Sequence, residues 1–476
     1  MKKTYVTNMP NHIGAFLKAS KCFSELGINI TRVSYNKAVD SHTLFIDVEG
    51  EEKDIKRADK KLQEIGYLSN GAENSKITLL EFVLEDKAGS VTKVLEIISE
   101  FNFNISYMSS QENGSGFQRF KMGLYENGSS DIERFIERVK KICEVNVIDY
   151  NRVEKVYDNS LFYSSYSKAL VDVMGLPAEK TKEVLVNVNL AMQTLDEKGL
   201  SPYKTFDSIS RFAELLAECK ADSFKPRISE YNILPNTKIT LIEPNCGSNT
   251  AIIESNGERL FVDSGYACYR NEMLKIINEL VADFGKREEQ LFITHADVDH
   301  CGLANDFDFV VVGERTADCL IAESELRFGY RENNPLHRPY VNICKILTEY
   351  KPIKKEKVFA KWKKSSLSKC LEKVGEFKVG ELDFSVYEGK GGHLLGETLL
   401  IDFNNKIAFT GDVFININGL TPKQAEYNKY APILMTSVDT NPLLCAEERK
   451  ELLDILGDGN WKIFGGHGKM KEYCKG

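Results

Sequence analysis

The densest group of potentially reactive residues lies in one short stretch, His295-Ala296-Asp297-Val298-Asp299-His300-Cys301-Gly302. It places four potential metal ligands within six residues, directly after the apolar run 291–294. Carboxylates crowded side by side repel one another unless a cation compensates their charge. The stretch therefore indicates a site for one or two divalent ions. Imidazole together with carboxylate suits zinc, and also iron or manganese.

Three further candidate ligands follow, and each lies beside glycine. They are His393 in Gly391-Gly392-His393, Asp412 after Phe409-Thr410-Gly411, and His467 in Gly465-Gly466-His467-Gly468. The chain has only seven histidines, so four in one ordered series are informative. Taken alone, His393 or His467 is more readily a structural histidine. Together their order favours a shared metal centre.

This series resembles the core signature of the metallo-β-lactamase fold, which is His-x-His-x-Asp-His, then a lone His, an Asp and a final His. The resemblance covers roughly residues 235–476 and extends to Gly247-Ser248-Asn249-Thr250 and to the turn Val262-Asp263-Ser264-Gly265. It implies an αββα sandwich and a hydrolase with two divalent ions, most simply zinc.

Carried over residue by residue, the resemblance gives each ligand a place. The first ion is expected at His295, Asp297 and His393, and the second at Asp299, His300 and His467, with Asp412 between them. Such ions lower the pKa of a bridging water until hydroxide forms near neutral pH. Asp299 is the candidate catalytic residue that orients this hydroxide. Asp263 is expected to hold the ligand histidines, or merely to form the turn before Gly265.

The departure from the pattern is Asp297, which stands where the family has a second histidine. An anionic, harder ligand makes an ion less Lewis-acidic and shifts preference toward iron or manganese, which leaves occupancy of the first position open. Flavodiiron proteins also carry a carboxylate there, so a di-iron redox enzyme is one alternative, although only nine residues follow His467 and leave no room for a flavodoxin-like domain. A sensor that binds a ligand without turning it over is another alternative.

Length and composition frame these expectations. With 476 residues the chain is too long for one ordinary core, and 42% hydrophobic with 28% charged residues is typical of soluble globular protein. No membrane span or signal peptide is expected, and eleven scattered cysteines without a CxxC pair indicate reduced thiols and a cytoplasmic location. A net charge of −8 argues against nucleic acid, and the lysine-rich segment 351–373 is more simply a solvated face.

The N-terminal part contains one pattern twice, offset by 75 residues. Asn11-His12-Ile13-Gly14 corresponds to Asp86-Lys87-Ala88-Gly89, and Ile28-Asn29-Ile30 to Phe103-Asn104-Ile105. Each copy has strand-like runs and two helical apolar stripes, and so predicts βαββαβ, the ferredoxin-like unit.

The turn into the first helix and the following Ile-Asn-Ile strand resemble the ACT domain. That resemblance implies an amino-acid effector near Asn11, Gly14, Asp86 and Gly89. The alternative is that the two glycines only permit a tight turn and that the pair is a dimerisation module. We expect an assembly of identical chains and a small-molecule substrate.

Between these parts the pattern is helical, with a run at 178–195 and another around 212–219. It could be a connector, a dimerising arm or a lid. Arg327, Arg331, His337 and Arg338 could bind an anionic group at the rim of the site, although a surface loop is the simpler interpretation. Cys301 could reach the ions, but packing is favoured. The predicted domains are ACT-like at 1–72 and 73–155, a helical connector at 156–232 and a catalytic domain at 233–476.

Overall fold

The computed structural model describes residues 2–8, 14–36, 43–65, 77–112, 116–125, 129–148, 163–198, 202–430 and 438–475. The chain divides into two compact units, one of residues 1–169 with 181–203 and the other of 170–180 with 204–476. Among the described residues, no helix is long and apolar enough to cross a bilayer. All eleven cysteines are free thiols, and eight of them are buried.

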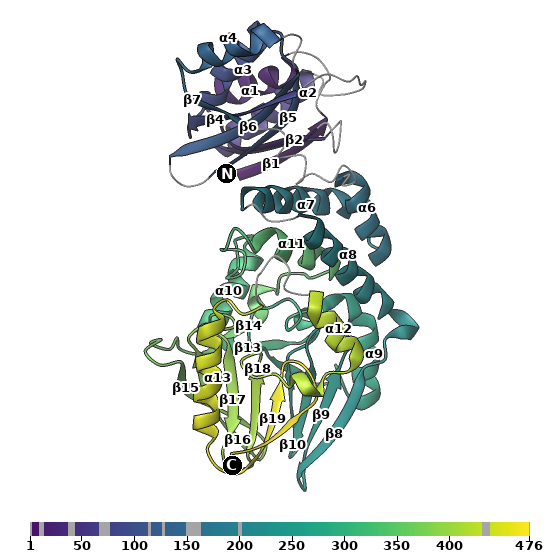
Figure 1. Ribbon diagram of the computed structural model, residues 1–476. Helices are drawn as coiled ribbons and strands as arrows, with labels where there is room; N and C mark the ends of the chain where they lie inside the picture. The colour runs from purple at the N-terminus through teal and green to yellow at the C-terminus, as the bar shows by residue number, and fades with distance from the viewer. Residues whose placement is uncertain are drawn as a thin grey trace. The chain divides into compact units, whose positions relative to one another are not determined.

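The first unit is built on one seven-stranded sheet with the order β1-β3-β2-β5-β6-β4-β7. The first copy of the repeat supplies β1 (Lys2–Asn8), α1 (Ala15–Glu25), β2 (Asn29–Asn36), β3 (Thr43–Glu49) and α2 (Glu52–Glu64). The second supplies β4 (Ile77–Glu85), α3 (Ser90–Glu100), β5 (Ile105–Glu112), β6 (Phe117–Tyr125), α4 (Ser129–Val139) and β7 (Glu144–Ile148). The four helices share one core with the sheet (Figure 1).

The second copy confirms the predicted βαββαβ order, since β7 pairs with β4 and β5 pairs with β6. The first copy has the same order as far as α2. Its expected last strand falls within residues 66–76, outside the described residues. The two copies join through β2 and β5, which pair antiparallel from Val33 with Ser110 to Asn36 with Tyr107.

The helical segment predicted at 156–232 is shared between the two units. It contains α6 (Tyr163–Met174), α7 (Lys180–Glu197) and α8 (Pro202–Glu218). Helix α7 belongs with the first unit, where Asn189 and Gln193 accept hydrogen bonds from the buried Arg32 of β2 at 2.6 and 2.7 Å. Helix α8 packs in the second unit, where Tyr269 donates a hydrogen bond to the Leu216 carbonyl at 2.9 Å.

Two sheets form the centre of the second unit. The first has the order β14-β13-β12-β11-β10-β9-β8 and the second β15-β16-β17-β18-β19-β20. The first sheet contains β8 (Arg227–Leu234), β9 (Thr237–Glu243), β10 (Thr250–Ser255), β11 (Glu258–Val262), β12 (Gln290–Phe292), β13 (Phe309–Gly313) and β14 (Val358–Trp362). The second contains β15 (Leu371–Val379), β16 (Leu382–Gly389), β17 (Thr398–Asp402), β18 (Ile407–Gly411), β19 (Asn460–Gly465) and β20 (Lys471–Cys474).

Apolar side chains from both sheets meet in one buried core, which includes Ile253, Phe292, Phe384 and Phe409. A second core lies between the other sheet face and α13 (Pro442–Leu456), through Leu452 and Leu456. The remaining helices are α9 (Arg270–Leu280), α10 (Glu314–Ser324), α11 (Arg338–Leu347) and α12 (Pro422–Tyr430). The predicted sandwich of two sheets with helices outside is therefore confirmed (Figure 1).

Candidate metal centre

The seven predicted ligands come from four loops at one edge of the sandwich. His295 to His300 follow β12, Asp412 directly follows β18, and His467 follows β19. The carboxyl ends of these strands point the same way locally, since β11, β12 and β13 run parallel and β18 runs parallel to β19. His393 lies in the loop between β16 and β17. The structure thus brings together residues that are up to 172 positions apart, from 295 to 467.

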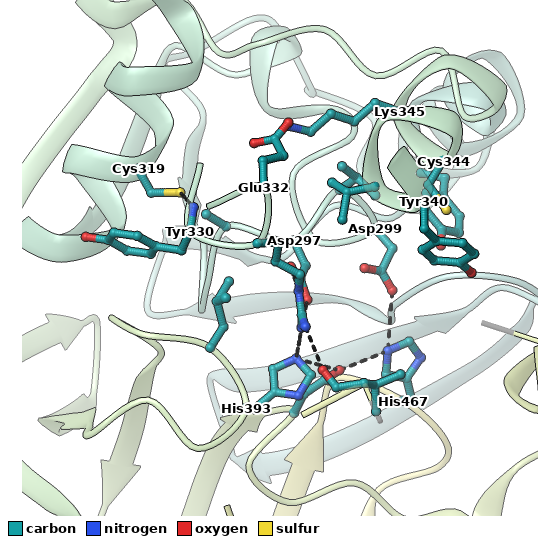
Figure 2. Close-up of a pocket in the computed structure, with 18 of the residues that line it drawn as sticks. Asp297, Asp299, Cys319, Tyr330, Glu332, Tyr340, Cys344, Lys345, His393 and His467 are labelled. Carbon is teal, nitrogen blue, oxygen red and sulfur yellow. Dashed lines mark hydrogen bonds and ion pairs between the residues drawn. The ribbon is translucent and has the colours of Figure 1, made fainter. Parts of the chain in front are cut away.

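The ligand atoms form two adjoining sets. Figure 2 labels Asp297 and His393 of the first set and Asp299 and His467 of the second. In the first, the Asp297 Oδ2 lies 3.4 Å from the His295 Nε2 and 3.3 Å from the His393 Nε2. In the second, the His467 Nε2 lies 3.4 Å from the Asp299 Oδ2. Three residues of the second set, Asp299, His300 and His467, have ligand atoms within 4.8 Å of one another.

Asp412 lies between the two sets. Its Oδ2 is 3.3 Å from the His467 Nε2 and 3.6 Å from the His393 Nε2, and its Oδ1 is 3.6 Å from the His300 Nε2. One carboxylate thus faces histidines of both sets.

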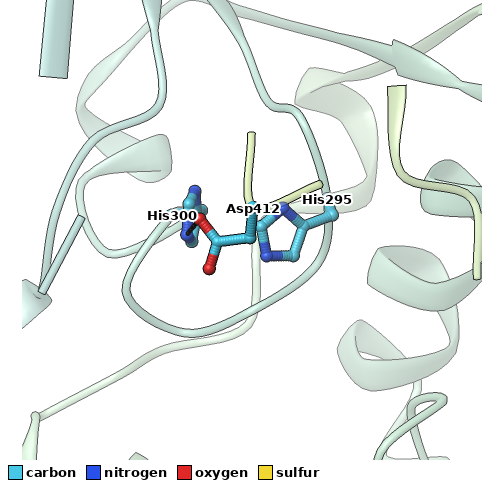
Figure 3. A group of neighbouring side chains, drawn as sticks. All are labelled: His295, His300 and Asp412. Atoms are coloured by element: carbon cyan, nitrogen blue, oxygen red, sulfur yellow. Dashed lines mark ion pairs between the residues drawn. The ribbon is translucent and has the colours of Figure 1, made fainter. Parts of the chain in front are cut away.

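Three buried atoms in this cluster fit a metal ion. Figure 3 shows His295, His300 and Asp412 close together. The Nε2 atoms of the two histidines and the Oδ1 of Asp412 take no hydrogen bond from any described residue. A buried polar atom without a partner is destabilising. Lone pairs of two imidazoles and a carboxylate converging in this way match the nitrogen and oxygen donors that a divalent ion requires.

The charges of the cluster also favour a bound cation. Burial lowers the pKa of His300, but Asp263, Asp299 and Asp412 outweigh burial and raise that pKa well above its usual range. Burial raises the pKa of Asp412, and His467 and His300 bring it well below its ordinary value. The site therefore attracts positive charge, whether as protons or as an ion.

Residues behind the ligands fix their orientation. Asp263 accepts hydrogen bonds from the Thr294 backbone N–H at 2.8 Å and from the Nδ1 of His300 at 2.8 Å. The contact predicted for Asp263 is present, and the residue also sits in a turn with a φ of 55°. His393 has a corresponding partner that the sequence did not reveal, since its Nδ1 lies 2.9 Å from Asp439.

Two buried glutamates that the sequence analysis did not select hold the loops. Glu397 accepts from the Asp412 backbone N–H at 2.6 Å, and burial raises the pKa of this carboxyl to about 8. Glu448 of α13 accepts from the N–H groups of Gly391 and Gly392 at 2.9 and 3.0 Å, and so fixes the loop that carries His393. Glu397 directly precedes β17, which begins at Thr398.

Arg331 is the least expected member of the site. Its Nε donates to the Asp297 Oδ1 at 2.6 Å and its Nη2 to the Asp297 Oδ2 at 2.5 Å. Burial raises the pKa of Asp297, but Arg331, His295 and His393 bring it well below its usual range. From the sequence, Arg331 was expected at the rim of the metal site or in a surface loop, and not in contact with a candidate ligand.

The other residues of that loop stay outside the ligand cluster. Arg327 pairs with Glu325 at the surface, and Arg338 donates to the Glu332 carbonyl at 2.7 Å. His337 is half-buried at the start of α11.

Cys301 is buried, and its thiol lies 3.5 Å from the His295 carbonyl, in agreement with a packing role.

Comparison with known proteins agrees with this geometry. A family model described as the Metallo-beta-lactamase superfamily matches residues 244–467. These residues form a metallo-β-lactamase superfamily domain. No curated protein matches the chain.

Several solved structures resemble parts of the chain at low identity. A metallo-beta-lactamase from Pontibacter korlensis is 15% identical, with 52% of this chain and 94% of that chain covered and a TM-score of 0.32. A metallo-beta-lactamase from Hirschia baltica is 13% identical, with coverage of 52% and 93% and a TM-score of 0.32. An aspartate kinase from Synechocystis is 14% identical, with coverage of 31% of this chain and only 28% of that chain and a TM-score of 0.25.

A cavity of about 120 Å³ opens onto the ligand cluster of the metallo-β-lactamase domain. Its walls include Asp297, Asp299, Asp412, His393 and His467 and a group of aromatic residues. The aromatic residues are Phe212 of α8, Tyr266, Tyr330, Tyr340 and Tyr427. The hydroxyl groups of Tyr266 and Tyr427 are hydrogen-bonded to each other. The cavity thus combines ionic groups with an apolar wall, as small-molecule sites do.

In the first unit, the candidate effector residues lie on both copies of the repeat. Gly14 and Gly89 adopt φ values of 77° and 85° at the starts of α1 and α3. Each faces the other copy, since a Cβ on Gly14 would lie 3.4 Å from the Ser99 Oγ and one on Gly89 would lie 3.0 Å from the Ser24 Oγ. Asp86 accepts from Asn29 and Gln118, and Asn11 lies outside the described residues.

Proposed function

We propose that the metallo-β-lactamase domain is a metal-dependent hydrolase acting on a small ester, thioester, lactone, amide or phosphoester. The observation that carries this proposal is the convergence of the unpartnered His295 Nε2, His300 Nε2 and Asp412 Oδ1 in a cluster whose members Asp297, Asp299, His393, Asp412 and His467 line a cavity. The cluster would hold a divalent ion, with zinc as the first candidate and iron or manganese as alternatives, and that ion would supply the Lewis acidity that makes a water reactive near neutral pH.

The chain's own residues supply orientation and exclusion of water. Asp299 lines the cavity with its Oδ2 3.4 Å from the His467 Nε2, where it can accept a proton from an attacking water and direct its lone pair. The aromatic residues that line the cavity, among them Phe212 and Tyr427, would exclude bulk water from it, which strengthens electrostatic interactions inside. A cavity of about 120 Å³ favours a compact substrate.

Metal content and turnover test this proposal together. Elemental analysis of gently purified wild type beside His300→Ala should find bound divalent metal that the variant loses. A panel of esters, thioesters, lactones and phosphoesters, with Asp412→Ala as the blank, should then reveal turnover. Iron with a visible absorption band would favour the redox alternative, and metal without any turnover would favour the sensor. Absence of metal from the wild type would refute a metallohydrolase.

The regulatory part of the proposal is that an amino acid binds between the two copies of the ACT-like repeat. Its support is the small space of about 10 Å³ between the copies, lined by Ser20, Asn29, Gly89 and Gln118. This space holds about one water, so binding needs a local separation of α1 from α3. A panel of all amino acids should raise the melting temperature or change the rate for at least one of them, and no response to any would contradict regulation. An assembly of identical chains and a cytoplasmic location remain predictions.

A further inference from the structure

The first ligand set contains a positive charge of its own. Arg331 lies in the loop between α10 and α11, and its side chain is 9% exposed. It binds both oxygens of Asp297, at 2.6 and 2.5 Å, in the bidentate arrangement that suits guanidinium and carboxylate best. The Asp297 carboxylate is 16% exposed, so this ion pair lies largely out of water.

The same guanidinium also contacts His393, another candidate ligand of the first set. The Arg331 Nη2 lies 3.1 Å from the His393 Nε2. The same Nε2 lies 3.3 Å from the Asp297 Oδ2, and the Nδ1 of the ring lies 2.9 Å from Asp439. Both ring nitrogens of His393 therefore already face protein partners, and the Nε2 that an ion would use faces the Arg331–Asp297 pair.

The two sets consequently differ in what they can still offer an ion. In the first, Asp297 and His393 are engaged, and only His295 keeps an unpartnered Nε2. In the second, the His300 Nε2 and the nearby Asp412 Oδ1 have no hydrogen-bond partner among the described residues. This difference between the two sets follows from the contacts that the Arg331 side chain makes with Asp297 and His393.

Arg331 is held in this position by its surroundings. Its Nη1 donates to the Val438 carbonyl at 2.6 Å. The residues before and after Arg331 in the sequence are also held in place. The Tyr330 hydroxyl donates to the Arg315 carbonyl at 2.9 Å, and Glu332 accepts from Lys345 at 2.6 Å. Displacing Arg331 would require these contacts to change or would leave Asp297 buried without its partner, which is costly.

We propose that Arg331 takes the place of the first of the two expected ions, so that the protein binds a single divalent ion at Asp299, His300, His467 and Asp412, with a ring nitrogen of His295 within 4.8 Å of the ligand atoms of His300 and Asp412. This inference rests on the proposed metallohydrolase function and deepens it. Arg331 is then a positioning residue, because it fixes Asp297 and His393 at the edge of the cavity without ligating the ion. The replacement of the family's histidine by Asp297 also gains a reason, since a carboxylate matches a guanidinium and an imidazole does not.

Stoichiometry tests this directly. Metal-free full-length protein is titrated with Zn²⁺ by calorimetry, and ions per chain are counted by elemental analysis after gel filtration. We expect about one ion for the wild type and a second, weaker ion for Arg331→Ala, which frees Asp297 and His393. Arg327→Ala is the matched control from the same loop, and it should keep one ion. Two ions in the wild type, or one in Arg331→Ala, would overturn the inference while leaving the hydrolase intact. Zero ions in the wild type would overturn both.

A second pair of variants locates the ion without altering Arg331. His467→Ala should weaken Zn²⁺ binding by about 100-fold or more, since it removes a direct ligand, whereas His393→Ala should change the affinity by less than about tenfold, the lower end of effects at residues around a metal ligand. Circular dichroism checks that both variants fold. Equal losses in the two variants would overturn the inference, since they would place the ion between the sets.

Discussion

The Oδ2 of Asp263 lies 2.8 Å from the Nδ1 of His300, and both side chains are buried. A carboxylate can only accept, so this contact keeps a proton on the His300 Nδ1 and leaves Nε2, which faces the Asp412 Oδ1 at 3.6 Å, as the nitrogen available to an ion. Asp263 adopts a φ of 55°, a conformation that asparagine tolerates as readily as aspartate. The residue thus sets the tautomer that metal binding needs.

Asp263→Asn should therefore weaken Zn²⁺ binding by about 10- to 100-fold while the fold persists. The amide can present its N–H₂ to His300, which favours the tautomer with the proton on Nε2 and removes the ligand lone pair. Competition against a chelator measures the affinity. Asp454→Asn, at an exposed surface pair with Lys475, is the control and should bind as the wild type does. An Asp263→Asn variant of unchanged affinity would show that His300 does not depend on this contact.

Gly466 makes room for two ligands. A Cβ at this position would lie 2.1 Å from the Asp412 Oδ1 and 2.8 Å from the His300 Cε1. Gly466→Ala should displace the Asp412 carboxylate and weaken Zn²⁺ binding by tenfold or more, an effect on the scale of about 1.4 kcal/mol. Gly313→Ala, whose Cβ would meet only the Thr398 Oγ1 at 3.1 Å, should bind normally. Calorimetric titration of both variants checks this, and equal affinities would argue against Asp412 as a ligand.

The position of the ligand candidates at one edge of the sandwich could be predicted from the sequence, because each of them follows a strand or borders glycine. His295 to His300 fill one loop, and Asp412 and His467 follow the parallel neighbours β18 and β19. Parallel strands bring their carboxyl ends to one edge whatever the rest of the chain does. The Asn256-Gly257 pair is a local hairpin signal in the sequence, and β10 does pair with β11 across it.

Contacts between separate loops could not be predicted in this way. Arg331 is 34 residues from Asp297, and Asp439 is 46 residues from His393. Each pair depends on how an irregular loop folds back, which neither helical nor strand periodicity encodes. Pairing of β2 with β5 was equally hidden, because the repeat predicts two similar units but not which edges meet.

Gly302 closes the ligand loop against the turn after Asp263. A Cβ there would lie 2.3 Å from the Ala267 nitrogen and from the Gly265 carbonyl oxygen. Both are backbone atoms that cannot rotate away, so Gly302→Ala should destabilise the domain by about 3 kcal/mol. Gly285→Ala is the comparison, since its φ of 72° is unfavourable but no atom lies within 4 Å, and it should cost about 1 kcal/mol. Urea unfolding followed by tryptophan fluorescence measures both, because Trp362 and Trp461 lie in the cores of this domain.

Thiol labelling separates a packing role for Cys301 from a metal-binding one. Burial raises the pKa of this thiol well above its usual range, so at pH 8 the reactive thiolate is scarce as well as shielded. Iodoacetamide should label the exposed Cys474 first and leave Cys301 unmodified in both metal-loaded and metal-free protein. Peptide mass spectrometry follows each site, and Cys474→Ser removes the fast reaction. Labelling of Cys301 that begins only when metal is removed would mean that its thiol is protected by an ion and would add an eighth ligand to the site.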